Sequence, residues 1–210
     1  WKELNDRVNR LAQAMLSFGL KKGDRVAIIS ENCHEYVEFL FAIAKTGLIS
    51  VAINYRLMVA QMVRILNDCE PEAIFVQDKF AGLARQIRSA VKSISIVVGM
   101  GEGHQCPHDY ESLLSGCPAV EPDVEVAEAD LFCIQYTTGT TGTSKGAMLT
   151  HKNIIANCMM RIQATPTGRD DVVLNTAPLF AGGHQARVFG NCFLGTTQVI
   201  TVFTPKNWAE

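Results

Sequence analysis

Apolar residues recur at helical spacing in several stretches of the chain. In residues 1–19 they stand three or four positions apart, at Leu4, Val8, Leu11, Met15 and Phe18. This spacing predicts a helix with one apolar face, and Gly19 is a suitable residue to end it. A second helix is predicted over 34–47, with Asn32 as its N-cap and Gly47 as its end. Further helical stretches are predicted at 58–69, 79–90, 151–164 (with Thr150 as cap) and 182–195.

Short runs that are apolar on both faces alternate with these helices. They lie at 23–30, 48–54, 73–76, 94–100, 131–136, 171–178 and 197–203, with a brief strand or turn at 146–150. Strands buried on both faces are typical of parallel sheets, so the fold class is α/β with mostly parallel sheets covered by helices.

One stretch, residues 99–129, interrupts the alternation. It is rich in Gly, Pro and acidic residues and is expected to form an irregular linker or surface excursion. The chain is therefore expected to contain a first α/β lobe over 1–98 and a second α/β segment over 130–210.

Composition narrows the class of protein. The 210 residues carry a formal net charge of −2 and a charged fraction of 19%, which argues against a nucleic-acid partner. No run of about 18 or more apolar residues and no signal peptide is present, so no transmembrane segment is predicted. The seven cysteines never form a Cys-x-x-Cys pair, which indicates reduced thiols and a cytoplasmic location. Both ends of the sequence fall within predicted helices, so we interpret the chain as a fragment of a longer protein.

The stretch YTTGTTGTSKG, residues 136–146, stands out in a chain that is 48% hydrophobic. Its glycines permit positive φ and close approach of a ligand. Its hydroxyls, backbone N–H groups and Lys145 can surround an anion, and a strand runs directly into it, as in phosphate-binding loops. The Gly-Lys pair of a Walker loop is absent. A polar loop without function is the alternative, and five threonines with a single lysine disfavour it.

Residues 136–153, YTTGTTGTSKGAMLTHKN, resemble the phosphate-loop signature of the AMP-forming adenylate ligase superfamily, which includes the acyl-CoA synthetases. The segments GDRVAI, INYRL, ILNDCEPEAIFV and NTAPLF also resemble this family, in the same order, and the likeness is greatest to fatty-acyl and medium-chain acyl-CoA ligases. Two positions depart from the family pattern. Ser144 stands where proline is usual, and the aromatic-His pair expected after PLF is missing, with His184 displaced by a helical turn.

The resemblance implies an ATP-dependent activation of a carboxylic acid, expected to be a fatty acid, to an acyl-adenylate, followed by thioester formation with coenzyme A. It also implies Mg²⁺ as a cofactor. Residues implied to bind the ATP phosphates are Thr137, Thr138, Gly139, Thr140, Thr141, Gly142 and Lys145, and those implied to border the acyl pocket are Phe180, Ala181, Gly182 and His184. Lys145 is the implied catalytic residue and would stabilise charge on the departing pyrophosphate.

The remaining family segments, including a mobile carboxy-terminal domain of the parent chain, lie outside these residues. The fragment alone is therefore expected to be inactive. The alternatives are a non-catalytic nucleotide-binding or structural module and an adenylation domain that feeds a carrier protein.

Three further features invite a function. His104, Cys106 and His108 alternate in HQCPH and are metal-ligand types, but no fourth ligand is spaced to join them, so a surface loop is favoured over a metal site. His151 is interpreted as a first-turn helix residue rather than an active-site contact. Arg56 is interpreted as a structural residue of its turn.

Overall fold

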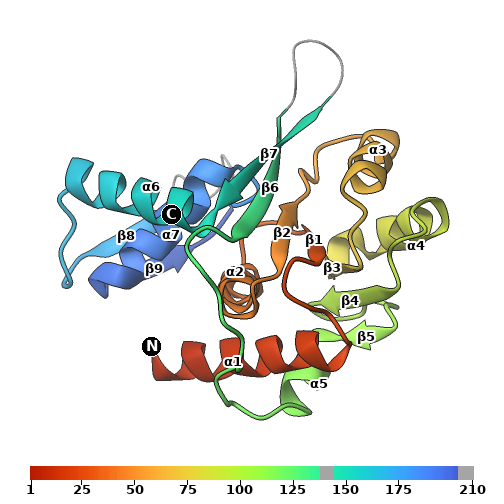
Figure 1. Cartoon of the computed structure of the whole chain (residues 1–210), viewed down its shortest axis with the longest axis horizontal. Helices are drawn as coiled ribbons and strands as arrows, with labels where there is room; N and C mark the ends of the chain where they lie inside the picture. Colours follow the sequence, from red (N-terminus) through yellow and green to blue (C-terminus); the bar gives the residue numbers. More distant parts are fainter. Residues whose placement is uncertain (138–143, 203–210) are drawn as a thin grey trace.

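The computed structural model describes residues 1–137 and 144–202 (Figure 1). Within these ranges the helices are α1 (Lys2–Ser17), α2 (His34–Thr46), α3 (Val59–Cys69), α4 (Ala81–Ala90), α5 (Tyr110–Ser115), α6 (His151–Ala164) and α7 (Gly182–Leu194), and the 3₁₀ turn is η1 (Asp78–Phe80). The strands are β1 (Arg25–Ile29), β2 (Ile49–Ala52), β3 (Ala73–Gln77), β4 (Ile96–Met100), β5 (His108–Asp109), β6 (Leu131–Thr137), β7 (Lys145–Thr150), β8 (Val172–Asn175) and β9 (Thr197–Ile200).

The main sheet contains seven strands in the order β5-β4-β3-β1-β2-β6-β7. All neighbours are parallel except β7, which runs antiparallel to β6. The register places Val26 of β1 beside Ser50 of β2 and Ala73 of β3. The carboxyl ends of the parallel strands therefore meet at one edge of the sheet, where ligands of α/β proteins commonly bind.

Helices cover both faces of this sheet, as the apolar strands predict. One face packs against α1, α2 and α5, and alternate strand residues such as Val26, Ile28 and Phe75 join them in a buried cluster. The other face packs against α3 and α4 through Ala27, Ile74 and their neighbours (Figure 1). The predicted α/β class with mostly parallel, helix-covered strands is confirmed.

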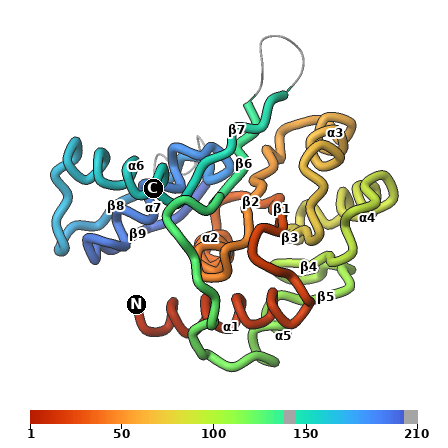
Figure 2. The backbone as a smooth tube through the Cα atoms, viewed as in Figure 1, coloured from red at the N-terminus to blue at the C-terminus, as the bar shows by residue number. Residues whose placement is uncertain are grey.

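A second sheet pairs β8 and β9 in parallel, with α7 as the connection between them. Helices α6 and α7 pack on each other beside it (Figure 2). Alternation of burial along β8 shows that Val173 and Asn175 face inward, whereas Val172 and Leu174 are exposed. This small sheet is thus covered on one face only within the described residues.

The stretch 99–129 contains more order than its composition suggests. Residues His108 and Asp109 form β5 beside β4, and Asp109 caps α5 by accepting a hydrogen bond from the Ser112 N–H at 2.8 Å. The expectation of an irregular segment is therefore wrong for 108–115. Residues 116–130, between α5 and β6, have no helix or strand, and their first part runs along α1, where Gln13 Nε2 donates to the carbonyl of Val120 at 3.0 Å (Figure 2).

Two predicted helix ends and one predicted N-cap are confirmed, and one predicted N-cap is wrong. Gly19 and Gly47 adopt φ of 84° and 65° directly beyond α1 and at the end of α2. Thr150 caps α6 with a hydrogen bond from the Asn153 N–H. Asn32 does not cap α2, because the N-cap is Cys33 and the Asn32 amide is used elsewhere.

All seven cysteines are free thiols. In residues 1–137 and 144–202, no helix is long and apolar enough to cross a membrane.

Candidate functional site

The Thr- and Gly-rich stretch joins two strands of the main sheet. Strands β6 and β7 pair in antiparallel register up to Thr137 opposite Lys145. Of the predicted phosphate-binding residues, Thr138, Gly139, Thr140, Thr141 and Gly142 lie outside the described residues. The structure thus defines the two ends of the loop, at Thr137 and Ser144.

A pocket of about 410 Å³ lies where this hairpin leaves the sheet. Thr137 and Ser144 line it together with Phe180, Ala181 and Gly182. The remaining lining residues are Ala52, Asn54, Leu57, Ile65, Gln135 and Tyr136. Thr137, predicted for phosphate binding, therefore shares one cavity with three of the residues predicted for the acyl pocket, although about 40 positions separate them in the sequence.

Sheet topology explains this convergence. Strand β6 pairs with β2 at Ser50 and Cys133, so the carboxyl end of β2 delivers Ala52 and Asn54 next to β6. The segment before α7 then crosses this edge. Gln135 of β6 fixes it by donating from Nε2 to the carbonyl of Phe180 at 2.6 Å.

Aromatic rings form one side of the site. Tyr55 packs edge-on against Phe180 with ring centroids 5.3 Å apart, and it stacks on Phe80 at the same centroid distance. The Arg56 guanidinium lies 5.5 Å from the Tyr55 centroid and 6.0 Å from that of Phe180. Cation–π contacts of this kind fix a turn, which supports the structural role expected for Arg56.

A smaller cavity of about 230 Å³ adjoins this aromatic group and is lined by Asn32, Tyr55, Arg56 and residues 176–178. Asn32 makes three hydrogen bonds to the segment that follows β8 and to Thr201. The turn after β1 and the segment before α7 are thereby joined across the carboxyl edge of the main sheet.

Two predicted site residues do not line the pocket. Lys145 begins β7, its side chain is exposed, and the structure gives it no ion pair within the described residues. His184 lies in the first turn of α7, outside the lining of both cavities. Burial lowers the pKa of His184, and the nearby Arg161 and Arg187 lower it further. The neutral imidazole is therefore favoured at pH 7.

Tyr136 ties the strand leading into the loop to the first half of the chain. Its hydroxyl donates a hydrogen bond to the carboxylate of Asp68 on α3. Burial and the neighbouring Asp68 carboxylate raise the pKa of Tyr136, so the phenol stays protonated and remains a donor.

The alternating HQCPH residues do not converge on a common point. His104 Nε2 lies 3.2 Å from Asp109 Oδ2, and the His108 ring packs against Phe18 at a centroid distance of 4.8 Å. No three His, Cys, Asp or Glu side chains group to hold a metal in the part of the chain that the structure describes. His151 occupies the first turn of α6 with its ring edge-on to Phe132 at 5.3 Å, in agreement with its interpretation as a helix residue.

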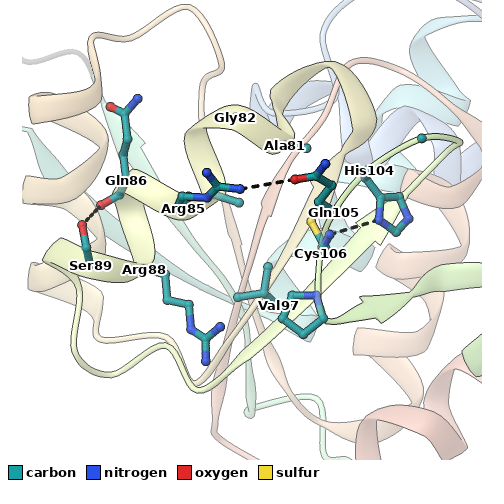
Figure 3. A pocket seen from close by; sticks show the side chains of 13 residues that line it. Ala81, Gly82, Arg85, Gln86, Arg88, Ser89, Val97, His104, Gln105 and Cys106 are labelled. Carbon is teal, nitrogen blue, oxygen red and sulfur yellow. Dashed lines mark hydrogen bonds between the residues drawn. The ribbon is translucent and has the colours of Figure 1, made fainter.

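A larger cavity, of about 710 Å³, lies away from the hairpin, between α4 and residues 103–107 (Figure 3). Arg85 donates from Nη2 to Gln105 Oε1 at 3.3 Å across it. None of the predicted site residues that the structure describes lines this cavity, so its size alone does not make it the site.

Sequence reasoning did not single out Asn32, Gln135 or Tyr55 as site residues. Gln135 directly precedes the Thr- and Gly-rich stretch, and Tyr55 belongs to the INYRL segment, so both lie close to recognised motifs. Nothing local indicates that the Asn32 amide reaches residues 145 and 169 positions away.

The fold and the pocket define an α/β protein in which the two ends of a Thr- and Gly-rich hairpin loop border a cavity at the carboxyl edge of a parallel sheet. The model of the AMP-binding enzyme family matches residues 1–210, and the chain belongs to this family.

Curated relatives are ligases of several acids. The chain is 33% identical over 178 residues to a feruloyl-CoA synthase of Amycolatopsis, covering 85% of this chain and 33% of the relative. It is 33% identical over 201 residues to the indoleacetate–CoA ligase of Aromatoleum aromaticum, covering 94% of this chain and 39% of the relative. The chain thus spans about a third of the length of these relatives.

Solved structures share the fold. The N-terminal domain of FACL13 from Mycobacterium tuberculosis superposes with a TM-score of 0.90 at 26% identity, covering 99% of this chain and 52% of that one. A putative long-chain-fatty-acid CoA ligase from Rhodopseudomonas palustris gives 0.87 at 28% identity, covering 97% and 51%. The described residues therefore have the fold of the N-terminal part of adenylate-forming enzymes.

Proposed function

We propose that the parent protein activates a carboxylic acid with ATP, releasing pyrophosphate, and then transfers the acyl group to the thiol of coenzyme A with release of AMP. The observation that carries the proposal is the pocket in which the loop ends, Thr137 and Ser144, meet Phe180, Ala181 and Gly182. Such a pocket suits an acid that must lie next to a phosphate chain.

The first half-reaction requires that the negative charge of the phosphates be neutralised and that the carboxylate be aligned with the α-phosphate of ATP. A carboxylate oxygen attacks the α-phosphorus of ATP, and the bond from that phosphorus to the bridging oxygen of pyrophosphate breaks. Because both reactants are anions, preorganised donors and an in-line geometry supply most of the rate enhancement.

The described residues supply donors suited to that task. Thr137 and Ser144 have hydroxyls at the pocket, and Lys145 adds an exposed cation at the same end of the hairpin. We assign Lys145 to the charge that develops on pyrophosphate, and residues 137–142 to the ATP phosphates. The lining holds hydroxyl and amide groups and no carboxylate among its described residues, which fits a polyphosphate, and a Mg²⁺ ion carried by ATP would neutralise further charge.

The acid is proposed to be a fatty acid. The relatives include a medium-chain-fatty-acid–CoA ligase of Ectopseudomonas oleovorans, which is 28% identical. They also include a feruloyl-CoA synthase and an indoleacetate–CoA ligase, each 33% identical. Aromatic acids are therefore the natural competitors to test. The pocket's apolar lining, from Ala52, Leu57, Ile65 and Phe180, is compatible with either kind of acid.

The acceptor thiol is proposed to be that of coenzyme A. A fatty acid–[acyl-carrier-protein] ligase of Streptomyces coeruleorubidus, 31% identical over 167 residues, shows why a carrier protein belongs in the test. A carboxy-terminal domain of the parent chain is proposed as the partner that completes the site, and residues 1–210 alone are proposed to lack turnover. A cytoplasmic location remains a prediction.

The test uses the full-length parent protein with ATP, Mg²⁺ and graded straight-chain and aromatic acids, with and without coenzyme A. AMP, ADP and thioester are quantified by mass spectrometry. Joint formation of AMP and acyl-CoA with straight-chain acids supports the proposal, and with aromatic acids alone it corrects the substrate class. AMP without thioester assigns the acceptor to a carrier protein, and no AMP with any acid favours a non-catalytic module.

A further inference from the structure

Residues 177–182, here called the wall segment, lie between β8 and the start of α7, include the first residue of α7, and form one side of the candidate site. Phe180, Ala181 and Gly182 line the pocket beside the hairpin, and Ala177 and Pro178 line the smaller cavity. Within the segment, a turn is closed by the Ala181 N–H, which donates to the carbonyl of Pro178 at 3.1 Å. Two side-chain amides from distant parts of the chain hold this turn in place.

The first amide is that of Asn32, in the turn between β1 and α2. Its Nδ2 group donates to the carbonyls of Ala177 at 2.9 Å and Thr201 at 3.0 Å, and its Oδ1 accepts from the Leu179 N–H at 2.9 Å. Both N–H donors and the carbonyl of the side chain are therefore used. Leu179 is only 1% exposed, so water does not readily replace these bonds.

The second amide is that of Gln135, on the strand that enters the Thr- and Gly-rich loop. Its Nε2 group donates to the Phe180 carbonyl at 2.6 Å. The same side chain packs so tightly on Gly182 that a Cβ added there would lie 2.6 Å from Gln135 Oε1. The wall segment is thus fixed to β6 two positions before Thr137, the first residue of the loop in the pocket.

We propose that Asn32 and Gln135 are positioning residues that set the wall segment against the base of the Thr- and Gly-rich loop and so determine which acids are held in line with the phosphates. The inference rests on the proposed function. A shift of the segment by a fraction of an ångström changes the width of the pocket at Phe180 to Gly182, where the acid would lie. Alignment of reactants is sensitive to displacements of this size.

The test compares isosteric substitutions in the full-length protein. Asn32→Asp keeps the size and the acceptor but presents an oxygen to two carbonyls in place of donors. Gln135→Met keeps the length and removes the donor. Asn67→Asp and Gln86→Met are matched controls, because both of these amides are exposed on helices outside the pocket.

Acid-dependent exchange of pyrophosphate into ATP gives kcat and KM for a series of acids. Loss of one bond to a buried carbonyl corresponds to about a tenfold change. We therefore expect KM for the preferred acid to rise about tenfold in Gln135→Met and by more in Asn32→Asp, which loses two donated bonds. KM for ATP should change less than about twofold, and the order of preference among acids should change. Equal loss for all acids, or an unchanged acid profile in an active enzyme, overturns the inference.

Hydrogen–deuterium exchange supplies a readout that is independent of turnover. Peptides containing residues 177–182 should exchange faster in Asn32→Asp and Gln135→Met and at the parental rate in both controls; unchanged exchange in the variants also overturns the inference. If the parental enzyme exchanges no pyrophosphate with any acid, the proposed function fails and the acid-selecting role fails with it. An active parental enzyme whose variants keep its acid profile overturns the positioning role alone.

Discussion

The seven-stranded and the two-stranded sheets differ in how far their apolar side chains are exposed to solvent. In β1 and β3, residues such as Val26 and Phe75 are at most 1% exposed, because helices cover both faces. In β8 and β9, Val172, Leu174 and Val199 remain 66%, 56% and 46% exposed. The described core is therefore concentrated in the seven-stranded sheet, and the two-stranded sheet is held largely through its helices and the wall segment.

This contrast bears on how the candidate site is built. The rigid contributions, from Ala52, Asn54 and Gln135, come from strands of the seven-stranded sheet or the turns that follow them. The wall segment comes from the less buried region around the two-stranded sheet. It is held by hydrogen bonds from the side-chain amides of Asn32 and Gln135, which belong to the region of the seven-stranded sheet. Substitution of Asn32 or Gln135 is therefore expected to alter the site while the buried core of the seven-stranded sheet stays intact.

The largest expected effect tests the difference in burial directly. Phe75 is 1% exposed and contacts the Phe39 and Tyr110 rings at centroid distances of 5.3 and 6.4 Å. Phe75→Ala removes a full aromatic side chain from the core and should lower the free energy of unfolding by about 4 kcal/mol.

The matched control is Phe193→Ala in α7, where the ring is 73% exposed. It should change stability by less than about 0.5 kcal/mol. Urea unfolding of both variants measures the difference, and similar losses would show that the two regions do not differ as the exposed fractions indicate.

The next effect concerns chemistry at the hairpin. If Lys145 stabilises charge on pyrophosphate, Lys145→Ala should slow adenylate formation about 100-fold, equivalent to about 2.7 kcal/mol. Thioester formation from supplied acyl-adenylate should change little, since pyrophosphate has already left. Rapid-quench assays of the two half-reactions measure this.

Lys152→Ala is the control for general loss of positive charge, because Lys152 is a surface residue of α6 that pairs with Glu128 at 3.1 Å. Equal slowing of both half-reactions by Lys145→Ala would contradict the assignment.

The helices, the buried strands and several of their ends follow from residues close together in the sequence. Spacing of apolar residues predicted the helices and buried strands, because a helix or strand requires only its own pattern; Gly19, Gly47 and Thr150 then mark ends as predicted. Helix α5 was missed because its six residues lie within a Gly- and Pro-rich stretch.

The candidate site divides in the same way. The Thr- and Gly-rich stretch and the residues from Phe180 to Gly182 were found from the family's motifs, and the structure places Tyr136, Thr137 and Ser144 of the stretch in one pocket with them. Asn32 was assigned as a cap because asparagine favours that position. Its actual partners are set by the packing of the two regions, which no local pattern encodes.

A smaller effect is expected within the region of the seven-stranded sheet, where Tyr136 joins β6 to α3. Its hydroxyl donates to Asp68, and Asp68 is an exposed residue of α3. Tyr136→Phe should therefore lower stability by only about 1 kcal/mol. A double-mutant cycle with Asp68→Asn isolates the bond, and additive effects of the two substitutions would show that the pair is not coupled.

The smallest expected effect is the contribution of His151 to the pH dependence of stability. His151 begins α6, and burial lowers its pKa below the ordinary value of 6.5, partly offset by the Asp130 carboxylate. Because the unfolded state binds the proton more readily, the contribution of His151 is complete above pH 6.5 and is lost as the pH falls through that value toward the folded pKa.

Unfolding measured between about pH 7.5 and 5.5 should therefore show stability that declines on acidification and declines less in His151→Gln. Residual dependence is expected from His184, whose pKa is lowered in the same direction. His34→Gln is the control, since His34 has a side chain that is 66% exposed. A variant slope equal to that of the parental protein would show that protonation of His151 does not contribute to the pH dependence of stability.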